Sequence, residues 1–86
     1  MSADYSVEVL PTAAREFARL PPHVMRRVAV ALRELEHDPR PRNSKKLRGS
    51  RNAYRLRLGD HRVLYEINKA RLLLTVLQIG ARRDIY

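Results

Sequence analysis

The sequence contains no cysteine, which excludes disulfide bonds, thiol catalysis and thiolate metal sites. Its three histidines, His23, His37 and His61, lie far apart in the chain, and its carboxylates are few and dispersed, which is not the pattern of a metal centre. A glycine-rich loop that could cradle a phosphate is also missing. We therefore expect a protein that uses neither a metal ion nor a cofactor and that is stabilised by packing alone.

Long apolar runs are absent as well. The most apolar run, residues 72–77, is far too short to span a bilayer. Residues 1–5 lack the basic and apolar regions of a signal peptide. We therefore expect a cytoplasmic protein that has no contact with a membrane. Its 86 residues predict one domain, residues 1–86, with a modest core that removes roughly 60 to 65% of the unfolded chain's surface from water.

Acidic residues are scarce: the chain has nine Asp and Glu against eighteen Lys and Arg, a formal net charge of +9 at pH 7. Such a balance points to a polyanionic partner, either nucleic acid or an acidic protein. Residues 39–59 are rich in basic side chains and contain no Asp or Glu. Phosphate complements such a stretch, although a basic loop is also compatible with plain solvation, and the few aromatic residues offer little stacking surface for single-stranded nucleic acid. The basic residues here are Arg40, Arg42, Lys45, Lys46, Arg48, Arg51, Arg55 and Arg57.

A β-hairpin is predicted between residues 54 and 67, where two alternating segments, 54–58 and 61–67, flank Gly59-Asp60. Taking Gly59 and Asp60 as the loop fixes the register of the two strands. This register pairs Leu58 with His61, Arg57 with Arg62, Leu56 with Val63, Arg55 with Leu64 and Tyr54 with Tyr65.

The two faces of this hairpin differ in character, because side chains alternate along a strand. Directly opposed like charges such as Arg57 and Arg62 are unfavourable, so a face that gathers three arginines suggests that an anion belongs between them. A solvated edge explains the same pattern equally well. The core face carries Tyr54, Leu56, Leu58, Val63, Tyr65 and Ile67, and the cationic face carries Arg55, Arg57, Arg62, Leu64 and Glu66.

The predicted elements follow the order β-α-α-β-β-β, an α+β fold in which two N-terminal helices pack on a mainly antiparallel four-stranded sheet. The basic stretch between the second helix and the hairpin is expected to be irregular because Pro41, Asn43, Ser44 and Gly49 interrupt it. The elements outside the hairpin are a strand over 6–10, a helix over 13–20 capped by Thr12, a helix from Pro22 to the Asp38-Pro39 break, and a strand over 71–79.

Apolar residues define the buried sides of the second helix and the last strand. In the helix they recur at helical spacing, and in the strand they occupy both faces, as expected for a central strand. The helix stripe is Val24, Val28, Leu32 and Leu35, and the strand presents Leu72, Leu74 and Val76 on one face and Leu73, Leu77 and Ile79 on the other.

Arginine dominates the side chains that could carry chemistry. It is a fixed cation that clamps phosphate and can stabilise charge in a transition state, but it is a poor proton acceptor. A general base must therefore be another residue, and His61 and Tyr86 are the available candidates. His61 falls on the core face in the predicted register, and Tyr86 would need cationic neighbours to ionise near neutral pH.

Three phrases of the sequence together resemble the RelE family of toxins from bacterial toxin–antitoxin modules. The similarity covers nearly the whole chain, including Leu20-Pro21 between the helices. The phrases read Lys46-Leu47-Arg48-Gly49, then Tyr54-Arg55-Leu56-Arg57-Leu58-Gly59-Asp60-His61-Arg62-Val63-Leu64-Tyr65-Glu66-Ile67, and then Ile79-Gly80-Ala81-Arg82-Arg83-Asp84-Ile85-Tyr86.

This resemblance implies a ribosome-dependent endoribonuclease that cuts messenger RNA in the ribosomal A site, with the RNA's own 2′-hydroxyl attacking the adjacent phosphate. It also implies a RelB-like antitoxin that neutralises the toxin. Because this chain is strongly basic, we expect the antitoxin to bind through an acidic segment. Operator DNA would be contacted only through the toxin–antitoxin complex.

The resemblance also assigns roles to five candidate catalytic residues. Arg55 and Arg57 stand where the family commonly places basic residues that contact or activate the RNA. Arg62 and Arg82 match its phosphate-stabilising arginines, and Tyr86 matches its near-terminal tyrosine. RNA or ribosome binding is expected from Arg40, Arg42, Lys45, Lys46, Arg48 and Arg51.

Two features depart from the family pattern. Ala81 stands where relatives often have a basic residue or histidine, and Arg55 and Arg57 replace lysines that could titrate. Two alternatives to RNA cleavage therefore stay open. The related ParE proteins share the fold and inhibit DNA gyrase without cutting RNA, and a catalytically degenerate relative would bind its antitoxin but lack activity. The arginine-rich face and Tyr86 favour RNA cleavage.

Overall fold

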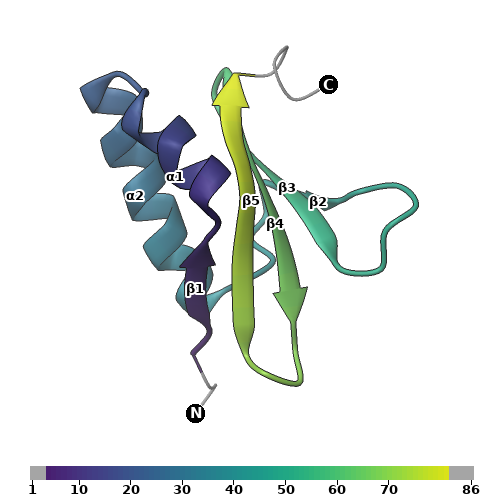
Figure 1. Cartoon of the computed structure of the whole chain (residues 1–86). Coiled ribbons are helices and arrows are strands. Elements are labelled where there is room, and N and C mark those ends of the chain that lie inside the picture. The colour runs from purple at the N-terminus through teal and green to yellow at the C-terminus, as the bar shows by residue number, and fades with distance from the viewer. Residues whose placement is uncertain (1–3, 82–86) are drawn as a thin grey trace.

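The computed structural model describes residues 4–81 and shows two helices packed on one face of a five-stranded sheet (Figure 1). The predicted α+β class, with two N-terminal helices on a mainly antiparallel sheet, is confirmed. No helix in this part of the chain is long and apolar enough to cross a membrane. The elements are β1 (Ser6–Val9), α1 (Pro11–Ala18), α2 (Pro22–His37), β2 (Ser44–Lys46), β3 (Ala53–Leu58), β4 (His61–Asn68) and β5 (Leu73–Ala81).

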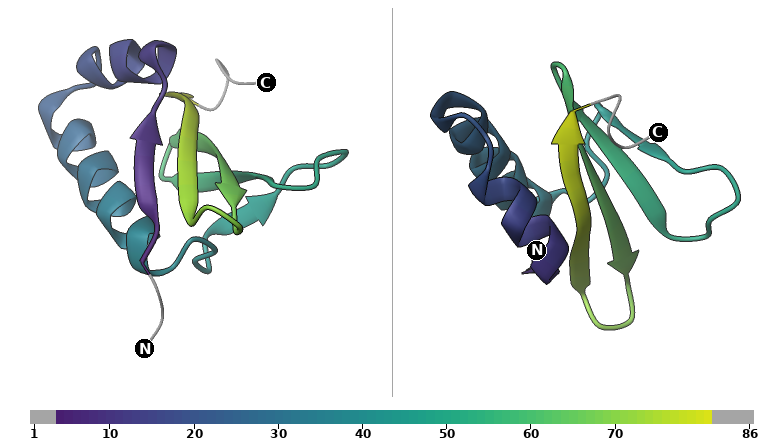
Figure 2. Two further views of the ribbon diagram at one scale, coloured as in Figure 1. Left: turned by 60° about the horizontal axis from the view of Figure 1, so that its bottom comes forward. Right: turned by 45° about the horizontal axis from the view of Figure 1, so that its top comes forward.

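The strands follow the order β1-β5-β4-β3-β2 across the sheet. β1 pairs with β5 in parallel, and the other three neighbouring pairs are antiparallel. β5 is thus an interior strand, as predicted. The helices form one layer and the sheet a second layer in both views of Figure 2, and the loop between β2 and β3 projects from the body of the molecule.

The strand that the sequence does not predict is β2, which lies in the basic stretch. It pairs with β3, so that Ser44 lies opposite Leu56 and Lys45 lies opposite Arg55. Asn43 extends this pairing, because its carbonyl accepts the N–H of Arg57 at 3.1 Å and its side-chain amide donates to the Arg57 carbonyl at 2.9 Å. A three-residue strand next to turn-forming residues has too few positions to show a period, so only its long-range partners reveal it.

The hairpin of β3 and β4 has the predicted register. Leu58 pairs with His61, Arg57 with Arg62, and the same register continues to Tyr54 and Tyr65. Gly59 takes a φ of 61° in the turn, a left-handed conformation that glycine adopts without a steric penalty. The tight Gly-Asp connection therefore fixes which side chains share a face.

β5 differs from the prediction in its bounds, Leu73–Ala81 instead of 71–79, which leave Leu72 outside the strand and exposed. It also differs in the side that Ile79 occupies. Simple alternation places Ile79 opposite in orientation to Leu74 and Val76. The structure has a β-bulge, because Leu64 of β4 pairs with Gln78 while its neighbour Tyr65 pairs with Val76. The additional residue of β5 shifts the alternation by one position. Ile79 consequently joins the core and is only 1% exposed.

The helices agree with the prediction except at the bounds of α1, which ends at Ala18 and not at residue 20, and at one core position of α2. α1 begins at Pro11, and its N-cap residue is Leu10 without any side-chain capping bond, so the predicted cap at Thr12 is wrong. Proline suits the first turn because an N–H there would have no helical partner. α2 has the predicted extent, but Leu32 is half-buried, and Ala31 takes its expected place in the core. The buried stripe of α2 is Val24, Val28, Ala31 and Leu35.

Tyr65 is among the largest fully buried side chains, and it links the segment after α2 to the sheet by a hydrogen bond. Its hydroxyl donates to the carbonyl of Pro39 at 2.7 Å, and its ring stacks on that of Tyr54 with 5.8 Å between centroids. Burial raises the pKa of Tyr65 to about 12. Tyr65 is therefore a neutral core residue that anchors β4.

Candidate functional site

Basic side chains gather on the sheet face opposite the helices. Lys45 of β2 lies opposite Arg55 of β3, and Arg57 of β3 lies opposite Arg62 of β4. Paired residues project from the same face, and side chains alternate along each strand, so all four belong to one surface. We call Lys45, Arg55, Arg57 and Arg62 the arginine face.

The members of the arginine face differ in exposure. Arg57 is exposed and Arg55 is half-buried, whereas Arg62 is only 2% exposed. Arg62 lies on an interior strand, between Arg57 of β3 and Gly80 of β5. Gly80 contributes no side chain to this face. Arg62 is therefore a nearly buried cation on the sheet, and Arg57 is a cation in contact with solvent.

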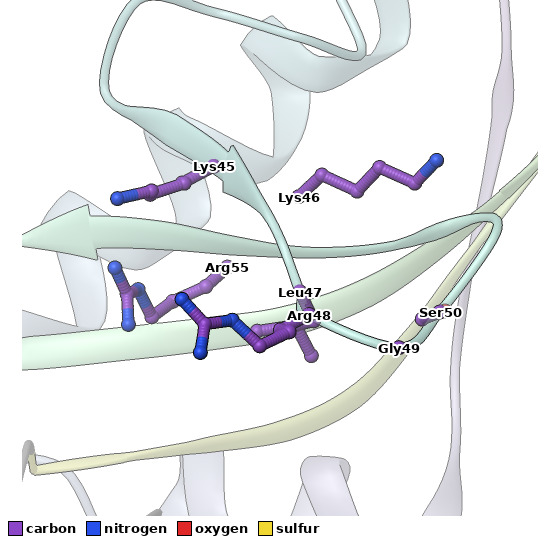
Figure 3. Close-up of a pocket in the computed structure, with 7 residues that line it drawn as sticks. All are labelled: Lys45, Lys46, Leu47, Arg48, Gly49, Ser50 and Arg55. Atoms are coloured by element: carbon purple, nitrogen blue, oxygen red, sulfur yellow. The ribbon is translucent and has the colours of Figure 1, made fainter.

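The arginine face continues into an open pocket of about 550 Å³ at the loop that joins β2 to β3 (Figure 3). We call it the basic pocket, because four of its seven lining residues are basic and none is acidic. In Figure 3 the side chains of Arg48 and Arg55 point the same way, whereas Lys46 points away from Lys45. The lining residues are Lys45, Lys46, Leu47, Arg48, Gly49, Ser50 and Arg55.

Three of the residues expected to bind RNA lie outside the basic pocket. Arg40 and Arg42 are exposed in the segment between α2 and β2, where the backbone N–H of Arg40 donates to the Asp38 carboxylate at 3.2 Å. Arg51 is exposed in the loop between β2 and β3. The structure therefore divides the predicted binding residues into a pocket group and three separate surface cations.

His61 lies on the helix-facing side of the sheet, as the predicted register requires. It lines a second pocket of about 320 Å³ together with Glu16 and Arg19. Its side chain therefore projects away from the arginine face and is not placed to act as a base there. The other predicted site residues, Arg82 and Tyr86, lie outside the described residues.

The arginine face can bind negative charge, and it supplies no nucleophile of its own. Arginine presents several N–H donors in a planar fork that matches the oxygens of a phosphate. Its guanidinium does not give up its proton at physiological pH, so these arginines cannot act as general bases. The chemistry that suits this surface is recognition of a phosphate and stabilisation of charge that develops on it.

Two further features escape prediction from the sequence. Glu16 of α1 accepts a hydrogen bond from the backbone N–H of Ile79 at 2.9 Å, although the two residues are 63 positions apart. An apolar groove of about 320 Å³ also lies between the helices and β5. Its only signal in the sequence is the apolar spacing of the helices, which does not distinguish a groove from a filled core. Its lining residues are Val9, Ala14, Phe17, Ala29, Leu32 and Ile79.

Comparison with known proteins places this geometry in a family. A family model described as the ParE toxin of the type II toxin–antitoxin system parDE matches residues 7–86. Toxin RelG of Mycobacterium tuberculosis is 29% identical over 83 residues, which are 95% of each chain.

Solved structures show the same similarity. The toxin–antitoxin complex RelBE2 from Mycobacterium tuberculosis matches with a TM-score of 0.81 and 28% identity, over 92% of this chain and 99% of that chain. The archaeal RelE–RelB complex from Pyrococcus horikoshii matches with a TM-score of 0.83 and 31% identity, over 92% of this chain and 96% of that chain. The chain therefore belongs to the RelE/ParE superfamily and is a toxin of a type II toxin–antitoxin system.

Proposed function

We propose that this toxin is a ribosome-dependent endoribonuclease that cleaves messenger RNA in the A site. The observation that carries the proposal is the arginine face, which sets Arg55, Arg57 and Arg62 on one sheet surface beside the basic pocket. The RNA's 2′-oxygen forms a bond to the adjacent phosphorus while the bond from phosphorus to the 5′-oxygen breaks. The nucleophile thus comes from the substrate, which agrees with a site that offers cations and no nucleophile.

The arginines act on charge that develops during this attack. Negative charge accumulates on the phosphate oxygens in the transition state, and guanidinium groups fixed before the reaction stabilise it without reorganising. Arg62 suits this role because the sheet holds it in place, and Arg57 lies directly opposite it. Arg82, which matches the second phosphate-stabilising arginine of the family, would complete the set.

The proton transfers need other groups. Tyr86, which matches the near-terminal tyrosine of the family, is the candidate acceptor for the 2′-hydroxyl proton, because arginines around a phenol favour its ionised form. A proton must also reach the departing 5′-oxygen. Arg55 and Arg57 contribute positive charge to both steps and do not exchange protons themselves.

The basic pocket binds the phosphates that flank the cleavage point. Lys45, Arg48 and Arg55 bring positive charge together there, without a lining carboxylate to oppose it. Contacts of this kind are sequence-independent and weaken steeply with salt. Lys46 and the surface cations Arg40, Arg42 and Arg51 add contacts to the ribosome or to the message.

A RelB-like antitoxin is the expected neutralising partner. The chain carries a net charge of +9, and the solved structures named above are the toxin–antitoxin complex RelBE2 and a RelE–RelB complex. An acidic antitoxin segment that folds on the toxin would cover the arginine face and compete with RNA for it. Operator DNA would be reached only through this complex.

A second function, inhibition of DNA gyrase without cleavage of RNA, is favoured by two observations. The matching family model is the one described as ParE toxin. Arg62 is also only 2% exposed, and a nearly buried arginine suits a structural role as well as contact with a phosphate. A degenerate toxin that binds only its antitoxin would share both features.

One experiment separates these functions. The toxin is added to a translating extract, messenger breaks are mapped by primer extension, and supercoiling by gyrase is assayed in parallel. Our proposal predicts breaks that depend on ribosomes and unchanged supercoiling. Loss of supercoiling without messenger breaks would establish the ParE-like function, and no effect in either assay would indicate a degenerate toxin.

A further inference from the structure

On one edge of β5, a side chain of α1 accepts a backbone N–H that no neighbouring strand in the described part of the chain pairs with. β1 pairs with β5 only from Leu73 to Val76, and the N–H of Leu10 donates to the Val76 carbonyl at 3.0 Å. Beyond that point β5 has no strand on this edge within residues 4–81. The carboxylate of Glu16 accepts the N–H of Ile79 there at 2.9 Å.

This bond lies next to the pair that contains Arg62. Successive N–H groups of a strand point to opposite edges, so an Ile79 N–H directed at α1 leaves the N–H of Gly80 directed at β4. Gly80 pairs with Arg62 in β4. Glu16 therefore holds β5 one residue before the position that faces the buried arginine.

The chemistry of Glu16 suits a firm anchor. The bond needs an acceptor oxygen at the end of a side chain of this length, and the Glu16 side chain supplies one. The bond is partly buried, which shields it from competing water. Glu16 also lines the pocket that contains Arg19 and His61, on the helix-facing side of the sheet. It is thus separated from the arginine face by the sheet itself and does not contact a phosphate bound there.

We propose that Glu16 is a positioning residue for RNA cleavage, because its bond to Ile79 fixes the end of β5 and thereby the place of Arg62. This inference rests on the endoribonuclease function proposed above. Displacement of a reacting or stabilising group by about 1 Å can lower a rate about a hundredfold. Glu16 therefore affects the rate of the chemical step and leaves ribosome binding unchanged.

The test compares two conservative variants that separate the length of the Glu16 side chain from its negative charge. Glu16→Gln keeps the oxygen that accepts the N–H but loses the negative charge, whereas Glu16→Asp keeps the charge on a side chain shorter by one methylene group. Glu34→Ala, which removes an exposed carboxylate from α2, is the matched control for net charge. Cleavage is measured as single-turnover rate on stalled ribosomes over a range of toxin concentrations.

We expect Glu16→Asp to lower the maximal rate about ten- to hundredfold with an unchanged half-saturating concentration. Glu16→Gln and Glu34→Ala should retain the rate of the unaltered chain within about threefold. Amide hydrogen exchange provides a readout independent of activity, since the Ile79 amide should exchange faster in Glu16→Asp than in Glu16→Gln.

The opposite order of the two variants would overturn the positioning role, because it would show that charge matters and reach does not. An active unaltered chain with an equally active Asp variant would overturn it as well. If the unaltered chain cuts no message in the presence of ribosomes, the proposed endoribonuclease function fails, and the role of Glu16 in cleavage fails with it.

Discussion

Arg62 and Arg48 carry the same guanidinium group in opposite settings. Arg62 lies on an interior strand and is only 2% exposed, whereas Arg48 is exposed in the loop after β2. A cation held by a sheet can stabilise charge at one fixed point. A loop cation in solvent can follow a phosphate backbone, but salt screens it. If the proposed function holds, we expect this difference to divide two tasks between the arginines, a fixed charge for the chemical step and adaptable charges for binding.

The largest expected effect follows from removal of the fixed cation. Arg62→Ala should lower single-turnover cleavage by about a hundred- to a thousandfold, because loss of one preorganised donor costs about 2.7 to 4 kcal/mol in the transition state. Arg62→Lys should recover little of this, since lysine lacks the planar fork. Arg82→Ala should behave like Arg62→Ala. Thermal unfolding of each variant is the control for folding, and a folded Arg62→Ala that cleaves at the normal rate would show that the wrong face is assigned.

A smaller effect is expected at the candidate base. Tyr86→Phe should lower cleavage at least about tenfold, at the low end of general acid–base contributions because other groups can substitute. A tyrosine that only stacks on a base would be replaced by phenylalanine with almost no loss. Single-turnover cleavage on stalled ribosomes distinguishes the two roles, and full activity of the Phe variant would leave the mechanism without its base.

The adaptable charges can be tested with two adjacent lysines. Lys45 belongs to the arginine face, and Lys46 points the opposite way (Figure 3). Lys45→Ala should weaken ribosome binding and reduce the slope of log affinity against log salt by about 1, and Lys46→Ala should change both less. Binding titrations at several salt concentrations measure this difference. Equal effects of the two substitutions would mean that the direction of the side chain does not matter for binding.

The last prediction concerns stability and not cleavage, at Tyr65 in the strand that also carries Arg62. Tyr65→Phe should lower the free energy of unfolding by about 0.5 to 1.5 kcal/mol near neutral pH, because the hydrogen bond to Pro39 is lost. The pKa of Tyr65 is raised from 10.0 to about 12 by burial, so the unfolded chain ionises first as the pH rises. Between pH 10 and 12 the unaltered protein should therefore lose about 2 to 3 kcal/mol that the Phe variant keeps.

Denaturant unfolding of both proteins at a series of pH values checks this prediction. The stability difference between them should shrink and then reverse as the pH approaches 12. A constant difference would show that the Tyr65 hydroxyl is not held in its neutral form by the fold. Unchanged cleavage by Tyr65→Phe near neutral pH would show that modest loss of stability does not imitate the effect of Arg62→Ala.

The three arginines of the arginine face could be predicted from the sequence because their geometry is local, whereas Lys45 joins them only through β2. Gly59-Asp60 fixes the turn, alternation fixes the faces, and the pairing of Arg57 with Arg62 follows by counting. The class of fold and the extent of α2 follow from apolar spacing in the same way. These features require only the periods of a strand and a helix.

The remaining features depend on contacts between distant segments. The bulge that directs the side chain of Ile79 toward the core arises from the pairing of β5 with β4. The sequence of β5 alone shows only alternation. The strand at Ser44–Lys46 exists because β3 is beside it. The near burial of Arg62 and the bond from Glu16 to Ile79 likewise need the assembled sheet and helix. Local pattern thus predicts which residues share a face, and tertiary packing decides which of them are fixed.

The most direct test compares the two arginines in one assay. Single-turnover cleavage on stalled ribosomes is measured against toxin concentration for the unaltered chain, Arg62→Ala and Arg48→Ala. We predict that Arg62→Ala lowers the maximal rate with an unchanged half-saturating concentration, and that Arg48→Ala raises the half-saturating concentration with an unchanged maximal rate. Equal losses of affinity in both variants, with the maximal rate preserved, would contradict the division between a fixed catalytic cation and adaptable binding cations.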